Sequence, residues 1–125
     1  MRPRHWSILA AVLMASALAA GCGGDDKNPM NPGGGTPDVT INIIGQNGTN
    51  SYNPSPDTVT VGQTVAWHNS NGTTHTATFV GTGGFNTSNV SAGSRSAAIQ
   101  MNTAGSYTYH CTIHPAMTGT LVVKP

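Results

Sequence analysis

The sequence predicts an all-β fold, an antiparallel sandwich or barrel of about six to eight short strands, and three observations indicate it. The 125-residue chain has sixteen glycines but only five basic and four acidic residues. This composition, together with abundant Thr, Ser and Asn, favours strands and tight turns over helices. Apolar and polar residues alternate in several short segments, as they do in half-buried strands. Turn residues separate these segments at the spacing typical of all-β domains.

The first half of the domain contains two alternating segments. Residues 39–43 alternate Val or Ile with Thr and Asn, which predicts a strand with one buried face. Residues 45–53 do not continue this pattern, so we expect a loop there. A second strand is expected around Thr60, because Val59 and Val61 on either side of it lie on the same face of an extended chain.

Turn residues mark the remaining strands. Gly62-Gln63 and Asn71-Gly72 are expected turns, and each leads into a segment rich in Thr, Val and aromatic residues. A glycine-rich stretch at residues 81–84 interrupts the pattern, and Ala104-Gly105 is a further expected turn. The strands expected after the first two are residues 64–69, 73–80, 94–101, 106–111 and 119–124.

Alternation also assigns side chains to the two faces of a strand. Cys111 shares a face with Tyr109, which is expected to be inward, and His110 lies on the other face. His75 shares a face with Phe79 and is therefore expected to point inward. His68 directly follows a Trp that belongs in the core, so it is expected to point outward.

The N-terminal segment, residues 1–21, has the features of an export signal. Basic residues precede an apolar run over residues 6–20, and this run is shorter than the roughly twenty residues of a comfortable membrane span. Residues 18–22 resemble a bacterial lipoprotein signal. This resemblance implies that Cys22 is lipidated and becomes the mature N-terminus, with ordinary cleavage near Ala20 as the alternative.

The predicted domain organisation follows from composition. Residues 22–37 are mostly Gly, Asn, Pro and Asp and are expected to be a flexible linker, which leaves residues 38–125 as one domain. We expect an exported, lipid-anchored protein on the periplasmic side of a bacterial membrane, or a soluble periplasmic one if Cys22 is not lipidated. A disulfide between Cys22 and Cys111 is disfavoured, because it would order little. The formal charge of +1 gives no field that would recruit nucleic acid.

The segment from residue 111 to residue 117 carries the chemistry. Cys111, His114 and Met117 place a thiol, an imidazole and a thioether at a C-x-x-H-x-x-M spacing. Soft sulfur donors and imidazole suit copper, whereas structural zinc sites rarely use Met, and no carboxylate accompanies the Cys and His as nucleophilic catalysis would require. A second imidazole must come from elsewhere: His75 is the inward candidate, and His68 is its competitor.

Residues 51 to 123 resemble the plastocyanin and amicyanin family of cupredoxins. Three segments carry the resemblance: the aromatic run before Cys111, the V-x-W-x-N block at residues 65–69 and the closing strand at residues 119–123. The short gap between His114 and Met117 is similar to that of amicyanin. It implies a Greek-key sandwich that binds one type 1 copper through His75, Cys111, His114 and Met117. The family usually has Asn directly after the first ligand His, where this chain has Thr76.

The resemblance also implies a function. The protein would be a non-enzymatic carrier that shuttles single electrons between exported or membrane redox partners and acts as a monomer. Partners would dock transiently at an apolar patch formed by His114, Pro115 and Ala116, and His110 is a candidate second route for electrons. The alternative function is periplasmic copper handling, in which the domain stores or delivers the ion.

Overall fold

The computed structural model describes residues 35–125 of the chain. The expected export signal over residues 1–21, the lipidation of Cys22 and most of the expected linker lie outside the described residues. Within residues 35–125, no helix is both long enough and apolar enough to cross a membrane.

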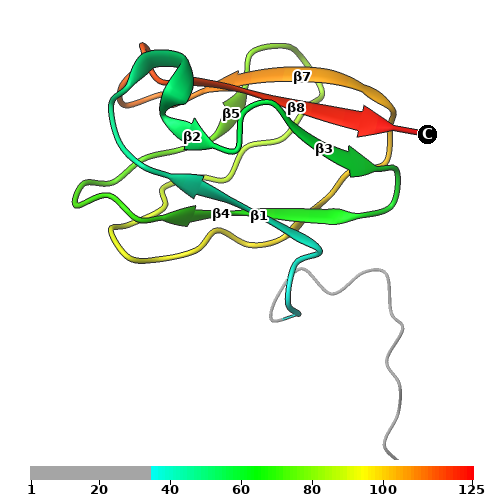
Figure 1. The fold of residues 1–125 in the computed structure, drawn as a ribbon, viewed down its shortest axis with the longest axis horizontal. Helices are drawn as coiled ribbons and strands as arrows, with labels where there is room; N and C mark the ends of the chain where they lie inside the picture. The colour runs from blue at the N-terminus through cyan, green and yellow to red at the C-terminus, as the bar shows by residue number, and fades with distance from the viewer. Residues whose placement is uncertain (1–34) are drawn as a thin grey trace, which may run out of the picture.

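Eight short strands and one turn of 3-10 helix form the described structure. The strands make two four-stranded sheets, with the orders β2-β1-β4-β6 and β3-β8-β7-β5, which lie one above the other in Figure 1. The elements are β1 (Val39–Ile43), η1 (Gly48–Asn50), β2 (Tyr52–Asn53), β3 (Asp57–Thr60), β4 (Thr64–Asn69), β5 (Thr78–Phe79), β6 (Ile99–Gln100), β7 (Gly105–His110) and β8 (Thr118–Lys124). The predicted all-β sandwich is confirmed.

The pairing within the sheets differs from the antiparallel prediction. The pairs β1–β4 and β3–β8 are parallel, whereas the other strand pairs are antiparallel. The chain crosses to the opposite sheet between β2 and β3 and again between β3 and β4, so a strand can return beside an earlier one in the same direction. Alternation of apolar residues has the same period in both kinds of pair, and therefore it could not distinguish them.

The core lies between the sheets and matches the alternating residues. Ile41 and Ile43 of β1, Trp67 of β4 and Leu121 of β8 are fully buried, together with Tyr109 of β7. Each fully buried aliphatic or aromatic side chain of this size contributes about 1.5–3 kcal/mol relative to exposure. This packing fixes the direction in which each strand presents its neighbouring side chains.

Several expected elements are shorter or different. Of residues 73–80 and 94–101, only β5 and β6 form ladder strands, and isolated bridges such as His75–Val90 hold part of the remainder. The expected loop at residues 45–53 contains η1, β2 and the buried Tyr52. Val61 is 41% exposed, because it follows the end of β3 at the rim of the sandwich, whereas Val59 is buried.

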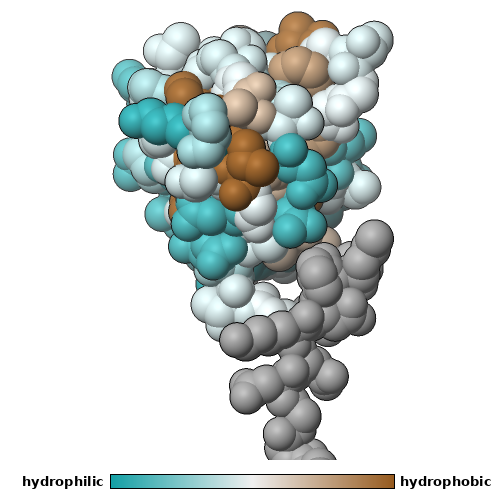
Figure 2. Space-filling view, turned by 90° about the vertical axis from the view of Figure 1, so that its right-hand side faces the viewer, coloured by the Kyte–Doolittle hydropathy of each residue, from teal (hydrophilic) through white to brown (hydrophobic). Residues whose placement is uncertain are grey.

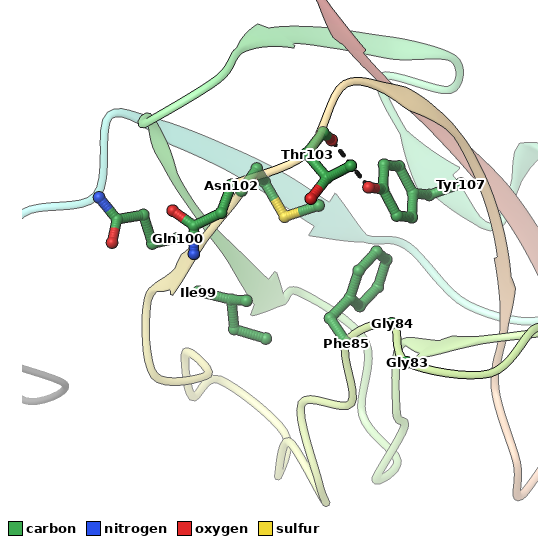
Figure 3. Close-up of a pocket in the computed structure, with 9 residues that line it drawn as sticks. Gly83, Gly84, Phe85, Ile99, Gln100, Asn102, Thr103 and Tyr107 are labelled. Carbon is green, nitrogen blue, oxygen red and sulfur yellow. Dashed lines mark hydrogen bonds between the residues drawn. The ribbon is translucent and has the colours of Figure 1, made fainter.

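The two ends of the sandwich differ. At the end where β7 begins, a cavity of about 310 Å³ lies between aromatic and polar side chains, among them Phe85 and Tyr107 (Figure 3), and the Tyr107 hydroxyl donates a hydrogen bond to the Thr103 carbonyl at 2.7 Å. Figure 2 views the molecule from this end, where apolar side chains reach the surface between hydrophilic ones. The strands β4 and β7 end at the opposite side of the molecule. The cysteine and histidine side chains that could bind a metal lie in the segments that follow these strands.

Candidate metal centre

Cys111 lies directly after β7, and its side chain is fully buried between the sheets. Its inward direction, expected from the shared face with Tyr109, is confirmed. Two backbone hydrogen bonds close the loop that follows: Cys111 N–H donates to the Met117 carbonyl at 3.1 Å, and Met117 N–H donates to the His114 carbonyl at 2.9 Å. The three potential donor side chains of this loop are thus held on one compact turn.

His75 reaches the same place from the segment between β4 and β5. Its backbone pairs with Val90 in an isolated bridge, with N–H to carbonyl distances of 3.2 and 2.8 Å, and its side chain is fully buried. The predicted inward direction is therefore confirmed. His68 lies on the outer face, where a ring nitrogen is 3.2 Å from the Ser70 hydroxyl, and it is not part of the donor cluster.

Three donor atoms converge at this end of the molecule. The Cys111 Sγ lies 3.9 Å from His75 Nδ1 and 3.8 Å from His114 Nδ1, and the two Nδ1 atoms are 3.1 Å apart. Zn²⁺, for comparison, binds imidazole nitrogen at about 2.0 Å and thiolate sulfur at about 2.3 Å. The ligand atoms around one such ion therefore lie about 3–4 Å apart. The distances fit a single metal ion held by all three atoms.

Met117 supplies the fourth expected donor side chain. It is fully buried and belongs to the same hydrophobic cluster as Cys111. Two imidazoles and a thiolate with a weakly bound thioether form the ligand set of type 1 copper sites. The donor set present therefore fits copper.

The surroundings of His75 favour the form of the ring that binds metals. Burial, and to a smaller extent the neighbouring His114, lowers the pKa of His75. A lower pKa keeps the imidazole neutral near pH 7, and only a neutral ring can offer a nitrogen lone pair to a metal.

Thr76 connects the two segments that carry the donors. Its backbone N–H donates to Cys111 Sγ at 3.3 Å, and its Oγ1 accepts a hydrogen bond from Thr112 N–H at 2.8 Å. Thr76 is almost fully buried. Although Asn is usual at this position in the family that the sequence resembles, the Thr hydroxyl links the His75 segment to the Cys111 loop.

The surface around the donors is apolar. His114 is half-buried, and Pro115 and Ala116 are exposed, as is Ile113 at 46%. His110 is half-buried on the outer face of β7, and its Nδ1 has no hydrogen-bond partner among residues 35–125. Ile113 was not among the predicted surface residues, although its apolar side chain directly before His114 was a signal for it.

A further contact was missed entirely. The Nε2 of His75 lies 3.0 Å from both Asn71 Oδ1 and Thr73 Oγ1. In the sequence analysis Asn71 was only a turn residue. The signal that could have revealed it is a pair of hydrogen-bonding side chains two and four residues before the candidate ligand.

Comparisons with known proteins agree with this geometry. The family model described as copper binding proteins, plastocyanin/azurin family, matches residues 38–124. Among proteins with curated functional descriptions, none matches the chain significantly. Among solved structures, the chain is similar to a purple cupredoxin from Nitrosopumilus maritimus, with 26% identity and a TM-score of 0.62 over 70% of this chain and 100% of that one.

Two further structures are similar. An amicyanin variant with Cu(I) shares 28% identity, with a TM-score of 0.59 over 69% of this chain and 81% of that one. A copper-containing nitrite reductase from Thermus scotoductus shares 29% identity, with a TM-score of 0.60 over 70% of this chain and 22% of the enzyme, so the chain spans about a fifth of the enzyme's length. Since the family match spans all eight strands and the whole donor cluster, this chain belongs to the plastocyanin/azurin family of copper-binding proteins, and its cofactor is one copper ion.

Proposed function

We propose that the protein is a type 1 copper electron-transfer protein whose ligands are His75, Cys111, His114 and Met117. The observation that carries the proposal is the convergence of two Nδ1 atoms and one Sγ within 4.8 Å of one another, beside a buried Met. When bound, copper would supply one-electron chemistry between Cu(I) and Cu(II). The protein's own residues hold the donors, keep water away from them and connect them to the surface.

The burial of the donors supports electron transfer. The side chains of His75, Cys111 and Met117 are fully buried, and hydrogen bonds and strand ends fix the segments that carry them. A closed set of four donors leaves no position for a substrate, which favours outer-sphere electron transfer over catalysis. A rigid frame also holds nearly the same donor geometry in both oxidation states, which keeps the reorganisation small.

His114 is the donor through which electrons would enter and leave. It is the half-buried member of the set, and Ile113, Pro115 and Ala116 surround it with exposed apolar surface. Few charged residues are present in the chain, so docking of redox proteins there would depend on apolar contact rather than on a steering field. We expect the encounter to be transient and the carrier to act as a monomer. His110 remains a candidate second route.

Copper storage or delivery is the competing function. A delivery protein must pass its ion to a partner's ligands, which requires donors that the partner can reach, whereas the Cys111 thiol is fully buried. The two functions differ in their kinetics. Rapid electron self-exchange with slow transfer of copper to an acceptor protein supports the electron carrier, and the reverse result supports delivery.

The location of the protein is part of the proposal. We infer export to the periplasmic side of a bacterial membrane, with a lipid on Cys22. Mass spectrometry of the N-terminal peptide after expression in a bacterium tests this inference: a diacylglyceryl adduct on Cys22 is expected. An unmodified peptide that begins near residue 21 would instead indicate a soluble periplasmic protein.

A spectroscopic titration tests the copper site. Cu(II) added to the reduced, purified chain should give an intense thiolate-to-copper band in the visible spectrum and a type 1 electron paramagnetic resonance signal. His75→Ala should abolish both, whereas the matched variant His68→Ala should leave both unchanged. A folded protein without the band would refute the site, and a band that survives in His75→Ala but not in His68→Ala would reassign the second imidazole.

A further inference from the structure

We propose that Asn71, supported by Thr73, is a positioning residue that sets the tautomer and the orientation of His75 before any metal binds. The inference rests on the proposed function, because it takes Nδ1 of His75 as the atom that binds copper. It concerns the opposite nitrogen of the same ring. Which of the two nitrogens carries the proton is set by the hydrogen bond that the other one makes.

Two side chains meet the Nε2 atom of His75. Asn71 Oδ1 and Thr73 Oγ1 both lie 3.0 Å from it, and the Thr73 hydroxyl itself donates to Asn71 Oδ1 at 2.9 Å. Both distances are normal for a nitrogen–oxygen hydrogen bond. The ring of His75 is therefore held at Nε2 by this pair, while Nδ1 on its other side faces Cys111 and His114.

The direction of these hydrogen bonds can be worked out from a third contact. The backbone N–H of Thr73 lies 3.2 Å from the same side-chain atom of Asn71. A backbone N–H can only donate, so the Asn71 atom that it faces must be the oxygen and not the amide nitrogen. This oxygen can only accept, and therefore His75 Nε2 carries the proton. In the neutral ring the lone pair is then on Nδ1, the nitrogen that faces the other donors.

The loop before His75 is built to hold Asn71 in this place. The buried Asn69 donates from Nδ2 to the carbonyls of Thr73 and Val90 at 2.7 and 2.9 Å, and its Oδ1 accepts from Asn71 N–H at 2.9 Å. On the other side of the amide lies Gly45, at which an added Cβ would come within 2.8 Å of Asn71 Nδ2. A side chain at residue 45 would displace the Asn71 amide, so the glycine leaves room for it.

The inference predicts distinct effects for two substitutions of Asn71. Asn71→Leu removes one of the two acceptors at Nε2 and leaves only the Thr73 hydroxyl, which also loses its own acceptor, so the Nε2 proton is held less firmly. Loss of such an outer hydrogen-bond partner typically lowers metal affinity about 10–100-fold. Asn71→Asp keeps an acceptor at the same place and adds negative charge. That charge makes the imidazole a stronger donor, which stabilises Cu(II) over Cu(I) and lowers the reduction potential.

Nitrogen-15 nuclear magnetic resonance of the copper-free chain is the first test. In the wild-type protein, His75 should show the Nε2–H tautomer and a ring proton that exchanges slowly with water. Asn71→Leu should speed that exchange at least about tenfold, in line with the loss of a hydrogen bond of about 1.4 kcal/mol. The matched control is Asn47→Leu, which alters another Asn-Gly-Thr segment whose Asn side chain makes no cap hydrogen bond. It should leave His75 unchanged.

The second test uses the copper-loaded chain. Asn71→Leu should bind Cu(II) about 10–100-fold more weakly than the wild type, and Asn71→Asp should have a lower reduction potential while it retains the slowly exchanging Nε2 proton. If Asn71→Leu does not fold by circular dichroism, the Asp variant decides alone: an unchanged potential would overturn the inference.

An Nδ1–H tautomer in wild-type copper-free protein, or a His75 that Asn71→Leu leaves unaltered, would also overturn the inference. Because the resonance test needs no metal, it stands even if copper binding fails, and the two proposals can be refuted separately.

Discussion

Replacing Thr76 by valine should destabilise the protein by breaking the hydroxyl link between its two donor segments. Thr76 follows His75, and Thr112 follows Cys111; the Thr76 Oγ1 accepts from Thr112 N–H at 2.8 Å across these segments. Valine has nearly the same shape as threonine but no hydroxyl. The change therefore removes one acceptor, and it leaves the backbone N–H of residue 76 free to donate to the sulfur.

The size of the effect follows from the group left without a partner. Because Thr112 is exposed, water can replace part of the lost acceptor, and the cost should be about 1 kcal/mol, the net contribution of a typical hydrogen bond. For a domain of this size, each kcal/mol lowers the melting temperature by about 4–8 °C. A loss of about 1 kcal/mol would thus appear as a fall of roughly 4–8 °C.

Urea unfolding of the copper-free protein measures this loss without a contribution from metal binding. Thr76→Asn should recover most of the stability, because an amide oxygen can accept the same hydrogen bond. Thr78→Val is the control: its hydroxyl makes only long contacts of 3.4 Å, so the change should stay within about 0.5 kcal/mol. A Thr76→Val variant as stable as the wild type, or a Thr76→Asn variant no more stable than Thr76→Val, would refute this role of the hydroxyl.

Three further predictions concern other parts of the domain. Gly119→Ala should lose about 1–3 kcal/mol in thermal unfolding, because its Cβ would lie 2.5 Å from Tyr109 Cζ, whereas Gly72→Ala, with no atom within 4 Å of the new methyl, should not; equal melting temperatures would contradict this packing. Hydrogen bonds from the backbone and hydroxyl of Thr64 in β4 lower the pKa of Asp38. In urea unfolding, the wild type should therefore be more stable than Asp38→Asn above about pH 4 and should lose that advantage at lower pH. A difference in stability that persists at pH 2 would argue against this contribution of the carboxylate. Met117→Leu should keep the visible copper band and the fold, and the free energy of unfolding should fall by less than about 1.5 kcal/mol. Voltammetry should give a higher reduction potential, because a donor to Cu(II) is lost. An unchanged potential would show that the thioether is not a ligand.

Alternation predicted the strands that place every second side chain toward the core. The strands β1 and β4 have the predicted bounds, and β7 and β8 differ by only one residue at their ends. Alternation did not predict the segments that isolated bridges and side-chain hydrogen bonds hold in place. Residues before β5 follow an extended path, but an isolated bridge and side-chain hydrogen bonds fix them instead of a ladder. Tyr52 was missed because one buried aromatic in an irregular segment produces no periodic signal.

The donor cluster was predictable because its parts carry local signals. The spacing of Cys111, His114 and Met117 lies within one loop, and strand parity separated the inward His75 from the outward His68. The contacts that hold these donors have no such signal. The Thr76–Thr112 link spans 36 residues, and only the folded chain brings its two ends together.

Thr76 contacts the donor loop through two separate groups, its backbone N–H and its hydroxyl, and a substitution can test them separately. Its backbone N–H donates to the Cys111 sulfur, where hydrogen bonds tune the potential of a type 1 site, whereas its hydroxyl binds the neighbouring loop. A side-chain substitution removes only the second contact. A variant that loses stability but keeps its potential would show that the loop link and the sulfur hydrogen bond act independently. If both change together, the hydroxyl link also determines where the N–H lies relative to the sulfur.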